Sequence, residues 1–281
     1  MRTFSFEFFP PRDEIAAVDF GINIGRLLRL SPSFVTVTFG AGGSSRERTF
    51  ALVDYLQNKV GLNTVAHYTC VDASRKKIEE DLAALHEMGI TRLMLLRGDP
   101  PKGSDCFQTP TDGFANASEL IAFTRSLYGN HFSIGGGAYP ERHPEASSAE
   151  EDLLNLKRKV DAGCDFLITQ FFFDNSRYYN FVAQARAAGI TCPIIPGILP
   201  LTHFNQLERF VRISGAHIPD SFLQDLETHK GSPEKIAQIG RAYATAQCRD
   251  LLLSDAPGLH FFTLNKSRAT VEIFESLMGT V

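Results

Sequence analysis

The chain has 281 residues, of which 43% are hydrophobic and 21% charged, and its formal net charge is −4. This length can hold one large domain or two small ones. The acidic balance, without a basic cluster, argues against a nucleic-acid partner, and the lack of long apolar runs or a signal-peptide pattern argues against a membrane span or secretion. Five scattered cysteines without a C-x-x-C pair are typical of reduced thiols, so we expect a cytoplasmic protein. The eight histidines show no metal-binding spacing, and no metal site is expected.

The first predicted strand carries a glutamate among aromatic residues. Side chains alternate along a strand, so Ser5, Glu7 and Phe9 lie on the face opposite to the phenylalanines at even positions. If both faces are covered, Glu7 is a buried carboxylate that can donate a proton near neutral pH, because burial disfavours the charged form. The alternatives are another strand register or a glutamate paired with an arginine.

Short runs rich in β-branched and aromatic residues recur along the chain, each followed by a longer amphipathic stretch. The predicted strands cover residues 3–9, 34–39, 64–69, 92–97, 132–138, 166–170, 193–197 and 259–263. Three helical patterns open at segments containing capping serines (residues 45–48, 72–74 and 147–150). Glycines end three helical patterns just before a strand (Gly89, Gly163 and Gly189). The segment 201–258 is long enough for two helices or more.

Eight strands alternating with helices predict a mixed α/β protein with a closed (β/α)8 (TIM) barrel, for which about 250 residues are typical. The alternative is a doubly wound open sheet. That alternative is disfavoured because no G-x-G-x-x-G follows the first strand, which runs into Pro10 and Pro11. No linker interrupts the pattern, so we expect one catalytic barrel domain over residues 1–281.

Polar side chains gather at the ends of the predicted strands, where barrel enzymes build their active sites. No serine or cysteine lies in a nucleophile elbow, so hydrolysis is not indicated. On the helix that follows residue 148, Asp152, Asn155 and Lys159 share one face with Arg158 beside it. Taken alone, this face favours a solvated, salt-bridged surface; the alternative is a surface that binds ribose hydroxyls and phosphates.

Several short motifs follow one another in a distinctive order. They are SFEFFPP (5–11), VTFGA (37–41), LRGD (96–99), AYPERHPE (138–145), DLLNLKRKVDAG (152–163), TQFFFD (169–174), PGILP (196–200) and TLN (263–265). Together, and over the whole chain, they resemble the methylenetetrahydrofolate reductases of the short bacterial type.

This resemblance implies a FAD-dependent barrel that takes a hydride from NADH or NADPH, with NADH favoured. The flavin then passes the hydride to 5,10-methylenetetrahydrofolate, giving 5-methyltetrahydrofolate for methionine synthesis by ping-pong kinetics. A homo-oligomer is expected. Because the chain ends at Val281, we expect no regulatory domain of the kind found in longer eukaryotic members.

The resemblance also implies residue roles. Glu7 is similar to the family's general acid, which helps to open the imidazolidine ring, and Asp99 to the acid beside the flavin that makes hydride donation easier. The implied substrate-binding residues are Glu7, Thr38, Asp99, Gln170, Gln206, Phe210 and Lys266, of which Lys266 would attract the glutamate tail of folate. The implied FAD-binding residues are Thr38, Phe39, Ala41, His67, Arg97, Gly98, Asp99, Ala117, Tyr139, His143, Ala146, Asp152, Asn155, Arg158 and Lys159.

Four positions depart from the family pattern. Phe39 and Phe262 stand where tyrosine is common, Asn116 where an aromatic residue often precedes Ala117, and Cys164 where alanine is common.

Two other functions remain open: a barrel that binds folate or another acidic metabolite without turnover, and another barrel flavoenzyme such as a proline dehydrogenase-like oxidoreductase.

Overall fold

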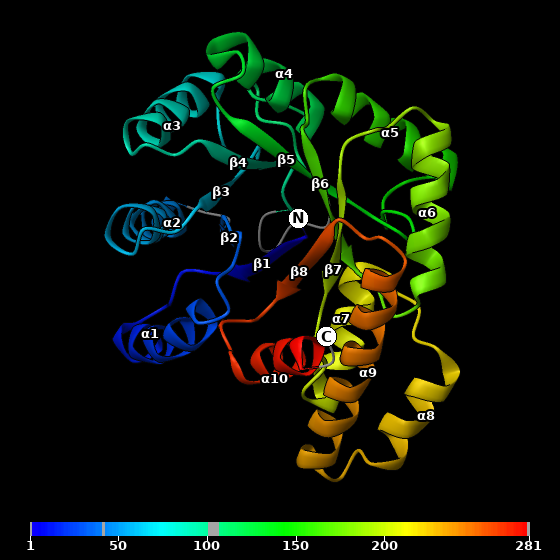
Figure 1. The fold of residues 1–281 in the computed structure, drawn as a ribbon. Helices are drawn as coiled ribbons and strands as arrows, with labels where there is room; N and C mark the ends of the chain where they lie inside the picture. Colours follow the sequence, from blue (N-terminus) through cyan, green and yellow to red (C-terminus); the bar gives the residue numbers. More distant parts are fainter. Residues whose placement is uncertain (1, 41–42, 101–106, 280–281) are drawn as a thin grey trace.

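The structure is a computed structural model that describes residues 2–40, 43–100 and 107–279. The described residues form eight parallel strands that pair in chain order and close into a barrel, with β1 also paired to β8 (Figure 1). The strands are β1 (Thr3–Phe8), β2 (Phe34–Val37), β3 (Thr64–Thr69), β4 (Arg92–Leu96), β5 (Ser133–Ala138), β6 (Phe166–Phe171), β7 (Ile194–Ile198) and β8 (Gly258–Phe262). The predicted (β/α)8 barrel is confirmed.

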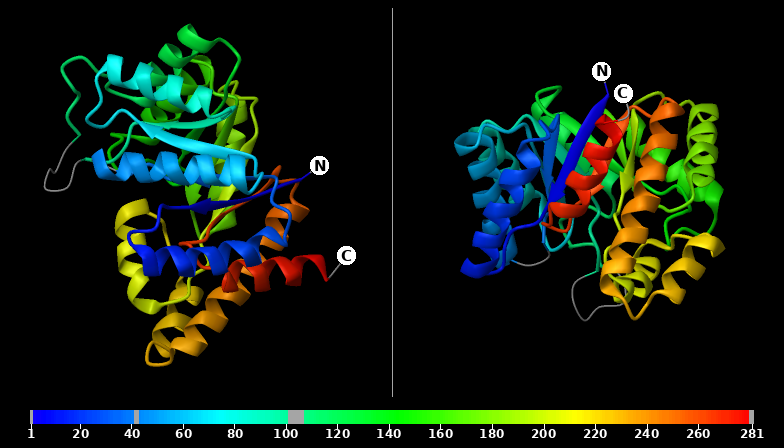
Figure 2. Two further views of the ribbon diagram at one scale, coloured as in Figure 1. Left: turned by 90° about the vertical axis from the view of Figure 1, so that its left-hand side faces the viewer. Right: turned by 60° about the horizontal axis from the view of Figure 1, so that its bottom comes forward.

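Helices surround the barrel on its outside (Figures 1 and 2). They are α1 (Glu14–Leu28), α2 (Gly43–Asp54), α3 (Arg75–Glu87), α4 (Ala117–Tyr128), α5 (Ala149–Asp161), α6 (Asn175–Ala187), α7 (Leu207–Ser214), α8 (Asp220–Thr228), α9 (Pro233–Leu253) and α10 (Arg268–Met278). A π-helical turn, η1 (Tyr55–Lys59), extends α2, and a 3-10 turn, η2 (Phe204–Gln206), precedes α7. The start of β1 and the end of α10 lie at the same end of the barrel (Figure 2).

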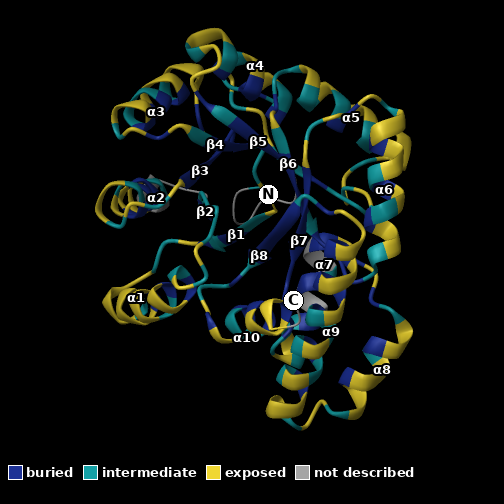
Figure 3. Ribbon diagram, viewed as in Figure 1, coloured by how far each residue is buried: buried dark blue, intermediate teal, exposed yellow. Residues whose placement is uncertain are grey.

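Two apolar layers hold the barrel together. Inside it, Val65, Met94, Ile168 and Ile195 form a closed cluster, so the lower interior is packed and is not a pore. The packing is tight enough to require a glycine at position 135, because a Cβ there would lie only 2.5 Å from the ring of Phe166. A larger core lies between the strands and the inner faces of the helices, seen as dark blue in Figure 3.

The predicted strands agree with the observed ones to within two residues at every end. Capping is also as expected for two helices: Ser74 Oγ accepts from Lys77 N–H at the start of α3, and Ser148 Oγ accepts from Glu151 N–H at the start of α5. The long connection contains α7, α8 and α9. Helix α1 had no predicted counterpart. Among the described residues, none of the helices combines the length and the apolar character that crossing a membrane requires.

Candidate active site

A cavity of about 800 Å³ opens at the carboxyl ends of the strands. All eight strands, or the loops that follow them, contribute side chains to it. Of the residues singled out in the sequence, it is lined by Glu7, Thr38, Phe39, His67, Arg97, Gly98, Asp99, Ala117, Tyr139, His143, Ala146, Asp152, Asn155, Arg158, Lys159, Gln170 and Phe210. This volume lies within the range of small-molecule and cofactor sites in proteins.

Glu7 points into this cavity from β1, between two histidines. Its Oε2 lies 3.8 Å from His67 Nε2 and 3.9 Å from His260 Nε2. Its side chain is 21% exposed, so the condition for a buried carboxylate, that both faces of β1 are covered, is not met. The reason is that only one face of β1 packs against helices, while the face that carries Glu7 borders the open cavity. Among the described residues, no arginine or lysine pairs with Glu7, which also sets aside that alternative.

His260 on β8 continues the cluster of polar side chains around Glu7 towards the packed interior of the barrel. It is buried, and its Nδ1 lies 2.9 Å from Ser5 Oγ, which is within hydrogen-bond distance. Ser5, His260 and Glu7 therefore form a continuous polar chain from the closed interior to the cavity. Sequence reasoning missed His260, because one histidine in an apolar strand carries no signal until β8 pairs with β1.

His67 is an uncharged neighbour of Glu7. Burial lowers the pKa of His67 from 6.5 to about 4; the charge of Glu7 opposes this shift and His260 adds to it. At neutral pH the approach of His67 to Glu7 is therefore not an ion pair. His67 Nε2 is buried, and it has no hydrogen-bond partner among the described residues. It is available to a bound ligand.

The lowered pKa of His67 predicts a pH-dependent stability. Between pH 6.5 and about 4 the unfolded chain binds a proton at this position that the folded chain does not, so the free energy of unfolding should fall as the pH decreases through this window. The pKa shift corresponds to a decrease of about 3 kcal/mol in the free energy of unfolding once the pH has fallen below both pKa values. Urea unfolding of wild type and His67→Asn at several pH values should show a shallower slope for the variant. A control, His86→Gln on α3, should keep the wild-type slope, and equal slopes for all three proteins would contradict the assignment.

Gln170 and Phe210 border the cavity on the side of β6 and α7. Gln170 Oε1 accepts a hydrogen bond from Phe171 N–H at 3.1 Å, which leaves the amide NH2 as its donor group. The ring of Phe171 meets that of Phe210 edge-on, with centroids 5.7 Å apart. Phe210 belongs to a second apolar cluster, which packs α7, α8 and α9 against the loops after β6 and β7. This side of the cavity therefore combines an amide with an aromatic wall.

The α5 side of the cavity is held by side-chain contacts with the loops. Lys159 Nζ donates to the carbonyl oxygen of Gly137 at 2.5 Å, and burial lowers its pKa. Asp152 accepts from the backbone N–H of His143 at 2.8 Å, and Arg158 donates to Asn155 Oδ1 at 2.9 Å. This face borders the cavity, as the alternative of a binding surface requires, while Asn155 and Arg158 on it are also exposed to solvent.

Arg97 joins the end of β4 to the loop after β5. It makes two hydrogen bonds to the carboxylate of Glu145, at 2.5 and 2.8 Å, and its guanidinium lies 5.0 Å from the ring centroid of Phe107. The hydrogen bond to Glu145 raises the pKa of Arg97, and the same contact lowers that of Glu145. Burial raises the pKa of nearby Tyr139 to about 12, so its hydroxyl stays protonated. This edge of the cavity carries a fixed cation and a neutral phenol.

Three predicted site residues are not part of this lining. Ala41 lies outside the described residues. Gln206 in η2 and the exposed Lys266 after β8 do not border the cavity. Of the four residues that depart from the family pattern, Phe39, Phe262 and Asn116 border the cavity. The fourth, Cys164, is buried behind β5, where its thiol donates to the carbonyl oxygen of Phe166 at 3.1 Å. The structure thus gives Cys164 a packing role.

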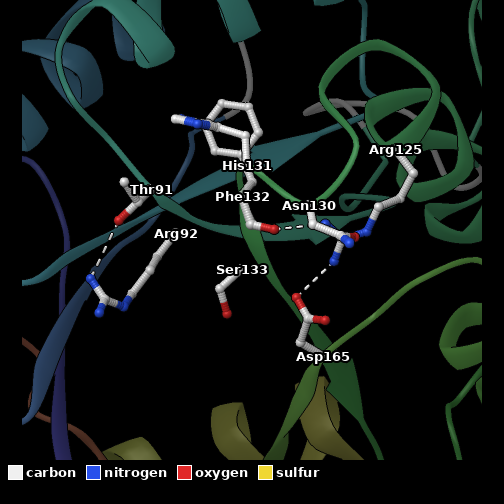
Figure 4. Close-up of a pocket in the computed structure, with 8 residues that line it drawn as sticks. All are labelled: Thr91, Arg92, Arg125, Asn130, His131, Phe132, Ser133 and Asp165. Atoms are coloured by element: carbon white, nitrogen blue, oxygen red, sulfur yellow. Dashed lines mark hydrogen bonds and ion pairs between the residues drawn. The ribbon is translucent and has the colours of Figure 1, made fainter.

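A smaller cavity of about 410 Å³ lies at the opposite end of the barrel (Figure 4). Arg125 crosses it and donates to the carbonyl oxygens of Gly163 and Phe132 and to the carboxylate of Asp165, each at 2.7 Å. These bonds tie the end of α4 to the starts of β5 and β6. Contacts at this face of a barrel serve stability, and catalysis belongs at the other end.

Comparisons with known proteins agree with this fold and cavity. Residues 1–278 match the family described as methylenetetrahydrofolate reductase. The chain is 37% identical to the 5,10-methylenetetrahydrofolate reductase of Escherichia coli (strain K12), covering 97% of this chain and 90% of that protein. It is 36% identical to methylenetetrahydrofolate reductase (NADH) 1 of Zea mays, over 98% of this chain and 48% of that protein. The chain thus spans about half the length of this plant relative.

Among solved structures, an uncharacterized protein from Clostridium thermocellum that binds two copies of 5-methyl-5,6,7,8-tetrahydrofolic acid superimposes with a TM-score of 0.66. The alignment covers 100% of this chain and 96% of that one at 16% sequence identity, a likeness that shows the fold. The match over nearly the whole chain, together with the identity to the bacterial enzyme, decides the family. This chain belongs to the methylenetetrahydrofolate reductase family.

Proposed function

We propose that this protein is a FAD-dependent reductase that converts 5,10-methylenetetrahydrofolate to 5-methyltetrahydrofolate, with NADH favoured over NADPH as electron donor. Family membership supports the reaction, and the name of the Zea mays relative supports NADH. The observation that carries the proposal is the convergence of Glu7, Asp99 and Gln170, from three separate strands, on one cavity. Two carboxyl groups and an amide around one cavity match the needs of pterin reduction.

The cavity fits a large, flat and anionic cofactor such as FAD. On the α5 side, Arg158 and Lys159 supply donors suited to a diphosphate, and Arg97 borders the same cavity from the end of β4, where it is paired with Glu145. Asp152 and Asn155 offer acceptors for ribose hydroxyls. Deeper in, the unpartnered Nε2 of His67 can meet a polar atom of the flavin ring.

The wall near the end of β4 also suits close approach of a ring. Gly98 has φ = +91°, a conformation that side chains rarely adopt, and a Cβ there would lie 2.5 Å from a methyl carbon of Val71. Only a glycine therefore fits here without a collision with Val71 or Thr69, which also line the cavity. When bound, FAD would accept a hydride from the nicotinamide and deliver it to the folate.

The chain's own residues would prepare the folate for that hydride. Glu7 would protonate a nitrogen of the imidazolidine ring, so that the ring opens to an iminium that accepts hydride. Because burial lowers the pKa of His67, this histidine adds no positive charge beside Glu7 at neutral pH. Gln170 would hold the pterin through its amide NH2, and Phe210 would stack on it. Both substrates would use the same cavity in turn, which gives ping-pong kinetics, and the product would serve methionine synthesis in the cytoplasm.

The test is a pair of anaerobic half-reactions on the purified protein, preceded by its visible spectrum. We expect a yellow protein whose flavin absorbance is bleached by NADH and restored by 5,10-methylenetetrahydrofolate. Running the first half-reaction with NADPH as well measures the nicotinamide preference. A colourless protein that binds folate but cannot be reconstituted with FAD would instead indicate a binding protein without turnover. Reoxidation by quinones but not by the folate would indicate another barrel flavoenzyme.

A further inference from the structure

Helix α1 carries an apolar stripe on the face that points away from the barrel. Ile15, Val18 and Ile22 are 79%, 64% and 53% exposed. Their spacing of three and four residues places them on one side of the helix. The inward side is already occupied by Phe20, Ile24 and Leu27, which are buried against the barrel. An outward apolar stripe is unusual on a helix that lies at the surface between α2 and α10 (Figures 1 and 3).

Small residues border this stripe along its whole length. Ala17, Gly21 and Gly25 recur every four residues, and a Cβ added at either glycine would have no atom within 4 Å. Each glycine in a helix interior costs about 1 kcal/mol relative to alanine. Contacts within the described chain do not require these glycines. What they do allow is the close approach of a second helix.

The charges of α1 indicate what that second helix is. Glu14 and Asp19 lie in its N-terminal half, and Arg26 and Arg29 at its C-terminal end. Asp19 and Arg26 are seven residues apart, so they lie on the same edge of the stripe. In an antiparallel pair of α1 helices related by a two-fold axis, the edge that carries Asp19 and Arg26 lies against the same edge of the partner helix. Each Asp19 is then next to the partner's Arg26. In a parallel pair the two-fold axis runs along the helices and brings opposite edges together, so Asp19 would not meet the partner's Arg26.

A membrane surface fits this face less well. Helices that lie on anionic membranes carry lysine and arginine along their polar side. Here Glu14 and Asp19 border the apolar stripe along half of its length, and they would be repelled by anionic lipids. The distribution of charge on α1 is complementary to itself and not to a lipid headgroup layer.

We propose that the outer face of α1 is an interface between two copies of this chain, which pack α1 against α1 antiparallel around a two-fold axis close to Ile22. In this arrangement Val18 of one copy lies over Gly25 of the other, where the missing side chain leaves room. One helix face is smaller than the roughly 800 Å² per partner of a standard interface. The association is therefore concentration dependent unless the edges of α2 and α10 add to it.

The first test is the sedimenting mass of the purified holoprotein between about 1 and about 100 μM. Ile22→Glu is expected to halve the mass of the assembly and to weaken association by about a hundredfold or more, because it places two carboxylates at the two-fold axis. The matched control is Leu253→Glu at the end of α9, where the native residue is 78% exposed and lies off this face. It should leave the mass unchanged. Circular dichroism checks that both variants fold.

The second test exploits the two-fold symmetry. Asp19→Arg and Arg26→Asp should each weaken association by about tenfold, because each places two like-charge contacts in the pair. An equimolar mixture of these two variants should associate again, as should the double variant, since both arrangements restore opposite charges at every contact. These changes leave the apolar stripe and the helix intact.

Three outcomes would overturn the proposal. One is a wild-type protein that stays monomeric over the whole concentration range. Another is a folded Ile22→Glu variant with an unchanged mass. The third is a monomer that binds vesicles of phosphatidylcholine and phosphatidylglycerol through the same stripe, which would assign this face to a membrane.

Discussion

Replacing Glu7 with glutamine is expected to reduce folate turnover by about a thousandfold or more, while NADH still reduces the flavin at a rate within a few-fold of wild type. A positioned general acid contributes about a hundred- to ten-thousandfold to a rate. Glutamine keeps the size and hydrogen-bonding shape of Glu7 but has no proton to give. Hydride transfer from the nicotinamide needs no such proton, so the two half-reactions should separate. Anaerobic stopped-flow absorbance of the flavin measures each of them.

The control for the loss of one carboxylate is Glu87→Gln at the exposed end of α3, which should leave both half-reactions unchanged. Comparable losses in the two half-reactions of the Glu7 variant would show that Glu7 acts in cofactor binding or folding. In that case the role assigned to it here would be incorrect. Near-wild-type folate reduction by the Glu7 variant would remove the general acid from the proposal altogether.

Gly240→Ala is expected to destabilise the protein by about 3 kcal/mol, the upper end of the usual cost of overpacking. Gly240 is buried in the middle of α9, where the helix crosses the loop after β7. A Cβ at this position would lie deep inside contact distance of the carbonyl oxygen of Leu201, and 2.8 Å from its carbonyl carbon. Both are backbone atoms and cannot rotate away, so α9 or the loop must move. Alanine's higher helix propensity recovers only about 1 kcal/mol.

Urea unfolding followed by circular dichroism measures this effect. Gly231→Ala is the matched control, because Gly231 is exposed just before α9 and a Cβ there has no atom within 4 Å. It should change the free energy of unfolding by less than about 0.5 kcal/mol. Because Leu199 in the same loop lines the cavity, Gly240→Ala should also weaken ligand binding. A loss of stability below about 1 kcal/mol would mean that α9 can shift without cost.

The strands of the barrel were predictable because each is a short apolar run between turn residues, and residues 64–69 match β3 at both ends. Helix α1 gave no such signal. Its Ile15 and Ile22 face outward, and Gly21 and Gly25 lower its helix propensity, so its apolar residues do not form a single stripe. If α1 packs against a second copy, both features follow from that contact and not from the fold of one chain.

The site was predictable in part. Polar residues at strand ends reach the cavity because a closed parallel barrel brings the carboxyl ends of its strands together, as Glu7 and Gln170 show. The exposure of Glu7 was not predictable, because it depends on how wide the mouth of the barrel is. Gln206 and Lys266, assigned only through the resemblance, lie in loops whose path the strand pattern does not determine.

The sequence by itself determined the order of the strands, the family, and through alternation the face of β1 that carries Glu7. Only the tertiary structure decided which side chains meet. Ser5 and His260 come within 2.9 Å although they are 255 residues apart, and Arg97 after β4 reaches Glu145 in the loop after β5. Such contacts depend on the stagger with which β1 and β8 close the sheet and on the path of its loops. That stagger results from the packing of the whole core, which no local pattern of residues contains.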